Sequence, residues 1–195
     1  MKRVPTVLLL AFALGAGRAR AQHAFGNAGP YDPAVPTPRS VLGYEVGERF
    51  TPHHMLSRYL ERLAQTSRRV RLDTVGRTFE GREVLMVIIT SEANQARLDQ
   101  VRADAARLAD PRGASASDLA TVSGRALPAV WLGYTVHGGE ASGTEASLAL
   151  AYQLAAGSDA ETRLVLDSTV VLIDPVQKVD RLELRPGSAG AALPQ

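Results

Sequence analysis

The chain contains no cysteine. This absence excludes disulfide bonds and metal sites built from thiolates. Any metal ion must therefore be held by histidine and carboxylate side chains. Histidine is scarce as well, because the sequence has four and the last of them is His137.

The chain also lacks a strong excess of charge of either sign. It carries 22 basic and 20 acidic residues, for a net charge of +2, and no basic block is interleaved with aromatic residues. Because nucleic-acid-binding proteins gather positive charge on one surface, we expect no nucleic acid among the partners. The 195 residues suffice for one domain with a real core but are short for two.

The first apolar run is too short to span a membrane. It covers residues 7–14 and follows two basic residues, whereas a spanning helix needs about 20 apolar residues. Residues 19–21 then give the small-residue spacing that signal peptidase reads. We therefore predict a signal peptide over residues 1–21, cleavage before Gln22, no stable membrane span after cleavage, and a secreted or periplasmic location. An N-terminal membrane anchor is the alternative.

Composition divides the remaining chain into three segments. Residues 22–43 contain four prolines, which favour extended backbone, so we predict a strap on the domain surface. Residues 44–177 carry the periodic patterns of a folded domain. Residues 178–195 are rich in Gly, Ala and Pro and are predicted to be irregular.

The domain begins with an amphipathic helix. Thr51 is predicted to cap it and Pro52 to be its first residue. His53 and His54 fall in its first turn, where adjacent positions diverge by about 100°, so we expect both on the surface rather than on one metal ion. The apolar side chains share one face: Met55, Leu56, Tyr59, Leu60 and Leu63.

Apolar runs predict the strands of a sheet. Residues 70–75 and 84–89 flank a turn region with two glycines, as in a hairpin, and the second run is apolar throughout, as in a central strand. Further strands are predicted at residues 128–136 and 168–175, both apolar and therefore buried.

Helical patterns separate these strands. A helix is predicted from Ser91 to about Leu108, with Leu98, Val101, Ala105 and Leu108 inward, and residues 114–126 are predicted to be a loop with a short helical turn. A second helix is predicted over residues 141–154, and a helical turn or two over residues 159–166. The resulting order predicts an α/β fold, a mixed sheet with helices on both faces.

A histidine and a glutamate stand at the carboxyl end of the strand over residues 128–136. His137 and Glu140 are separated by Gly138 and Gly139, whose backbone freedom lets both side chains turn towards one ion. Zinc accepts nitrogen and oxygen ligands together. The pattern therefore predicts a shared zinc site in a pocket, and the alternative is a solvated histidine beside a glutamate that favours the helix start.

Three segments of this chain resemble the zinc carboxypeptidases of the carboxypeptidase A type, especially their secreted bacterial branch. Residues 75–82 are similar to the early hairpin signature of that family, and residues 137–143 to its first zinc motif. Residues 170–177 are similar to the strand that leads to an Asn-Pro-Asp-Gly turn. The resemblance implies a carboxypeptidase A-like α/β fold and a peptide or protein C-terminus as the substrate. It also implies one zinc ion with two histidine ligands and a glutamate ligand, of which His137 and Glu140 are carried over.

The chain departs from that family after residue 177. Lys178 follows where the turn is expected, and no histidine follows His137, so the family's third ligand, general base and substrate-binding residues have no counterpart here. We therefore expect the N-terminal part of a secreted zinc metallocarboxypeptidase, truncated and inactive as it stands. Catalytic and substrate-binding residues stay unassigned.

Two other interpretations compete. A non-catalytic secreted α/β domain, or a fragment that misfolds, would leave apolar edges uncovered. An α/β-hydrolase-type esterase would use the His-Gly-Gly run at residues 137–139 as an oxyanion loop. That class needs a Gly-x-Ser-x-Gly elbow, which residues 186–190 fail to match, and a later histidine.

Overall fold

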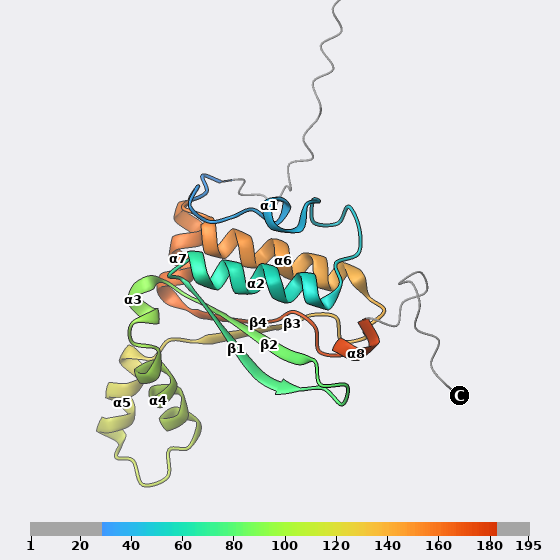
Figure 1. Ribbon diagram of the computed structural model, residues 1–195. Helices are drawn as coiled ribbons and strands as arrows, with labels where there is room; N and C mark the ends of the chain where they lie inside the picture. Colours follow the sequence, from blue (N-terminus) through green and yellow to red (C-terminus); the bar gives the residue numbers. More distant parts are fainter. Residues whose placement is uncertain (1–28, 183–195) are drawn as a thin grey trace, which may run out of the picture.

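The computed structural model describes residues 29–182, and the predicted signal peptide and the last part of the predicted tail lie outside them. A four-stranded sheet has the order β1-β2-β4-β3 (Figure 1). β2 pairs antiparallel with β1 and with β4, whereas β3 and β4 are parallel, so the predicted mixed α/β sheet is confirmed. The strands are β1 (Val70–Arg77), β2 (Glu83–Ile89), β3 (Ala129–Gly133) and β4 (Val170–Asp174).

The two inner strands owe their position to their apolar composition. Val87 and Ile89 of β2 and Ile173 of β4 are fully buried on one face, and Ile88 is buried on the other. Branched side chains of this kind favour a pleated strand that is covered on both sides. β2 is therefore the central strand that its sequence predicts.

One face of the sheet is covered by a thick helical layer. Figure 1 shows α2 (His53–Thr66) and α6 (Ala141–Ala156) lying side by side over the strands. Leu56, Leu60 and Leu148 from these helices are buried against the strands. Both α1 (Pro38–Leu42) and α7 (Ala160–Ser168) belong to the same side of the molecule.

The opposite face is covered at one end. There α4 (Leu98–Ala109) packs Leu98 and Val101 against Ile88 and Val170, so helices do lie on both faces as predicted. The short α3 (Glu92–Gln95) precedes it, and α5 (Ala116–Arg125) lies beside it. The buried Asp104 of α4 accepts two hydrogen bonds from Arg125 of α5.

Two helical predictions on this side were wrong. The expected single helix from Ser91 breaks at Arg97, and its C-terminal half turns Asp104 inward while Ala105 and Leu108 are exposed. The predicted loop at 114–126 is instead largely the helix α5, which Ser115 and Asp118 start with a reciprocal capping box. Such a box satisfies free N–H groups at a helix start, so a polar segment can begin a helix here.

The first helix and the strap also differ from the prediction. Pro52 is the N-cap of α2 rather than its first residue, and Thr51 is buried before it. The proline-rich strap forms α1, which Thr37 caps and which ends at Gly43 with a φ of 83°. Its Val35 and Leu42 join the main core, because an apolar side chain every few residues lets even an irregular segment pack.

The edge strand and the predicted tail also differ from the prediction. β3 was predicted to be buried, but Trp131 is 62% exposed and Val130 41%, since β4 is its one strand partner in the described part of the chain. Residues 178–195 were predicted to be irregular, yet Val179–Leu182 form the helical turn α8. Val179 and Leu182 are fully buried, and this apolar pair seats the turn on the core.

Candidate metal site

Three loops meet at the end of the sheet where β3 and β4 terminate. Because β3 and β4 are parallel, their carboxyl ends lie together, and the antiparallel β2 begins at the same edge. The segment after β3, the segment after β4 and the hairpin turn at residues 78–82 therefore converge. This edge holds the residues that the sequence singled out.

His137 and Glu140 are brought together here. His137 Nδ1 lies 3.0 Å from Glu140 Oε1, and the backbone N–H of Glu140 donates to the carbonyl of His137 at 2.9 Å. The hydrogen bond from His137 lowers the pKa of the Glu140 carboxyl. Their side chains are 71% and 56% exposed, so the pair lies on an open loop rather than in the predicted pocket.

The donor atoms of this pair suit zinc in type. An imidazole nitrogen and a carboxylate oxygen 3.0 Å apart can both lie within about 2.1 Å of one ion. Among residues 29–182, no group of three or more His, Asp or Glu side chains is placed to hold a metal. A catalytic zinc keeps three protein ligands, and this pair offers donor atoms for two of them.

Thr135, which sequence reasoning missed, supports the loop that carries His137 and Glu140. Thr135 is buried and has a φ of 47°, in the left-handed region that a β-branched residue rarely adopts. Its Oγ1 lies 2.8 Å from Thr144 Oγ1 and 3.4 Å from the Glu140 carbonyl oxygen. A Cβ on Gly143 would lie 2.9 Å from the Thr135 nitrogen, so the helix start packs directly on this turn.

Glu145 is a second residue that sequence reasoning missed. It is 7% exposed, and its carboxylate accepts the backbone N–H of Thr51 at 2.8 Å and that of Gly47 at 3.1 Å. α6 thereby holds the loop that leads into α2. The available signal was its helical spacing from the buried Leu148, which places Glu145 on the apolar face.

Asp174 ends β4 beside this edge. It is 7% exposed, its Oδ1 has no hydrogen-bond partner among the described residues, and burial raises the pKa of its carboxyl. It pairs in register with Gly133. The backbone N–H of Tyr134 donates to its carbonyl at 2.8 Å, which extends the β3–β4 ladder towards the loop.

The other described histidines lie on α2. His54 is exposed, as predicted, but His53 is 9% exposed, with Nε2 3.0 Å from the Glu83 carbonyl oxygen. The first turn of α2 faces the start of β2, which accounts for its burial. His23 lies outside the described residues.

Comparison with protein-family models agrees with the sequence motifs. The zinc carboxypeptidase family model matches residues 56–184. The crystal structure of carboxypeptidase A from Helicoverpa armigera aligns with a TM-score of 0.49 and 15% identity, over 75% of this chain and 32% of that chain. This chain thus spans about a third of that structure. A search of curated proteins finds no match.

The matched region contains all four strands and the loop that carries His137 and Glu140. It covers more than half of the 195 residues, from α2 past α8, and includes His137 and Glu140. The chain belongs to the zinc carboxypeptidase family.

Proposed function

We propose that this chain provides the first zinc-binding segment of a metallocarboxypeptidase, an enzyme that hydrolyses the C-terminal peptide bond of a peptide or protein. His137 and Glu140 are the ligands. The observation that carries the proposal is the 3.0 Å contact between them, directly after a sheet strand and inside the region that matches the family.

The chemistry of the pair fits this role. A zinc ion, when bound, polarises a carbonyl group and activates water. Zinc ligands have to be deprotonated before they bind, and the hydrogen bond from His137, which lowers the pKa of Glu140, favours the ionised carboxylate. The high exposure of both side chains leaves the ion open to substrate from the solvent side.

Hydrolysis also needs catalytic and substrate-binding groups that are not identified among residues 29–182. The third ligand, the general base and the residues that bind the substrate carboxylate have no identified counterpart among them. Substrate and activity are therefore proposed for the complete enzyme. This chain spans about a third of the carboxypeptidase A structure. Family membership sets aside the esterase alternative.

We also propose that the protein is exported. The support is the pattern of residues 1–21, which lie outside the described residues. No helix in the described part of the chain is long and apolar enough to cross a membrane. N-terminal sequencing of protein recovered from an exporting host should begin at Gln22, and an uncleaved Met1 would contradict the proposal.

Zinc titration by calorimetry tests the assignment of the ligands. The 195-residue chain should bind zinc weakly, and His137→Ala and Glu140→Gln should each weaken binding by about tenfold or more, which is roughly 1.4 kcal/mol. His54→Ala is the matched control, because it removes an exposed imidazole on α2 and should leave affinity unchanged. Equal losses in the control, or unchanged binding in His137→Ala, would refute the assignment.

A further inference from the structure

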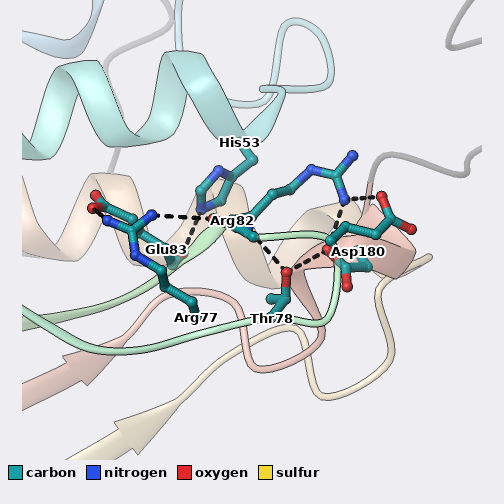
Figure 2. Close-up of polar contacts among 8 residues, drawn as sticks. His53, Arg77, Thr78, Arg82, Glu83 and Asp180 are labelled. Atoms are coloured by element: carbon teal, nitrogen blue, oxygen red, sulfur yellow. Dashed lines mark hydrogen bonds and ion pairs between the residues drawn. The ribbon is translucent and has the colours of Figure 1, made fainter.

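The hairpin turn at residues 78–82, α8 and the loop at residues 134–140, which carries His137 and Glu140 and is called the metal loop, form one connected unit. We propose that Asp180 is a positioning residue that fixes the His137–Glu140 pair through α8, an inference that rests on the proposed function. It acts through a clasp formed by Thr78, Arg82 and Asp180, shown in Figure 2.

The clasp joins two segments that are far apart in the sequence. Asp180 Oδ1 accepts hydrogen bonds from Thr78 Oγ1 at 2.8 Å and from Arg82 Nη1 at 2.6 Å. Thr78 Oγ1 also accepts the backbone N–H of Arg82 at 3.1 Å, which shapes the turn itself. One oxygen of Asp180 therefore ties both ends of the turn to α8, and one of these bonds is charge-assisted and so stronger than a neutral bond.

At neutral pH the clasp contains an ionised Asp180 paired with the cationic Arg82. Partial burial acts to raise the pKa of Asp180, but the hydrogen bonds from Thr78 and Arg82 outweigh it and lower the pKa overall. The Arg82 side chain is 31% exposed and that of Asp180 is 24% exposed. The pair is thus half-buried, where it is screened less than an ion pair in open solvent.

α8 is held on its other side by the core. Val179 and Leu182, which flank the clasp residue, are 1% and 0% exposed and belong to the main apolar cluster. A turn of four residues has little stability of its own. Its position is therefore set by these two anchors, the apolar pair and the clasp.

α8 in turn packs closely against the metal loop. A Cβ on Gly138 would collide with Arg181 and would lie 2.6 Å from the backbone nitrogen of Leu182. Gly138 is buried, whereas Gly139 is exposed and a Cβ there would meet nothing within 4 Å. The first glycine of the pair is therefore needed for contact with α8, and the second is not.

This contact limits how the loop can move. Gly138 is covalently next to His137, and the N–H of Glu140 bonds back to the His137 carbonyl. If α8 were displaced, Gly138 would lose its packing contact with α8, and the side chains of His137 and Glu140 could separate. The fixed α8 keeps Nδ1 and Oε1 at the spacing that one ion requires.

Two sets of variants of the 195-residue chain test the inference. Asp180→Ala removes the acceptor, and Asp180→Asn keeps a neutral acceptor for Thr78. Arg77→Gln is the matched control, because Arg77 bonds Glu83 on the same hairpin at 2.6 Å instead of α8 (Figure 2). Gly138→Ala and Gly139→Ala form the second matched set.

Amide hydrogen exchange without metal is the first readout, and zinc affinity is the second. In Asp180→Ala and Gly138→Ala, the Glu140 amide should exchange about tenfold faster or more, while the β2 amides of residues 87–89, which report global unfolding, keep their rates. Zinc affinity should fall in parallel and recover partly in Asp180→Asn. Arg77→Gln and Gly139→Ala should match the parent chain in both readouts.

The two readouts separate this inference from the proposed function. If the parent chain fails to bind zinc at His137, the proposed function fails, and exchange at Glu140 still judges the positioning role. If Glu140 exchange is unchanged in Asp180→Ala, the positioning role is wrong whatever the zinc affinity. A rise in exchange at β2 equal to that at Glu140 would also overturn it, because the loss would then be global.

Discussion

Glu140 and Glu145 lie at the start of the same helix and differ sharply in their surroundings. Glu145 is 7% exposed and accepts two backbone N–H groups, from Gly47 and Thr51. The Glu140 side chain is 56% exposed and contacts the imidazole of His137. One carboxylate faces the core and the other faces solvent.

The difference separates a structural carboxylate from one that can bind an ion. A buried carboxylate is tolerated when its oxygens are hydrogen-bonded, and both oxygens of Glu145 are committed to the loop before α2. Glu140 keeps lone pairs open to solvent, as a metal ligand must. The two residues therefore differ in their roles: Glu145 contributes to folding stability, whereas the role proposed for Glu140 is in metal affinity.

The largest expected effect is on the buried carboxylate. In Glu145→Gln one oxygen becomes an N–H₂ group that faces a backbone donor, so one buried N–H loses its partner. We expect the free energy of unfolding in urea to fall by about 1–3 kcal/mol.

Glu140→Gln is the matched variant for this comparison. It makes the same chemical change on an exposed side chain, and the free energy of unfolding should equal that of the parent chain within error. A larger loss of stability in Glu140→Gln than in Glu145→Gln would reverse the assigned roles.

A smaller effect is expected beneath the metal loop. Thr135→Val removes the hydroxyl that contacts Thr144 Oγ1 at 2.8 Å while keeping the β-branched shape in the left-handed conformation. The loss should be about 1 kcal/mol. Because both hydroxyls serve one contact, the double variant with Thr144→Val should lose less than the sum of the single variants, and simple additivity would argue against the contact.

The sequence predicts most of the sheet and the adjacency of His137 and Glu140. Apolar runs identify the strands, and the three-residue spacing after β3 correctly indicates that His137 and Glu140 can meet. These features are local, since each depends on residues close together in the chain. The zinc-binding role of the pair stays a prediction.

Long-range contacts could not be predicted in the same way. The burial of His53 depends on Glu83, and the anchoring of Glu145 depends on Thr51, which is remote from it in sequence. Asp180 of the helical turn α8 bonds Arg82, which lies 98 residues earlier in the chain. Such pairings depend on how the helices pack on the sheet. The periodicity of a single segment does not predict them.

The central claim is that His137 and Glu140 bind one zinc ion. The most direct test is anomalous diffraction at the zinc edge from crystals of the 195-residue chain grown with zinc. The account predicts an anomalous peak within about 2.1 Å of both His137 Nδ1 and a Glu140 carboxylate oxygen. A peak at His53 or His54, with the His137–Glu140 pair free of metal, would contradict it.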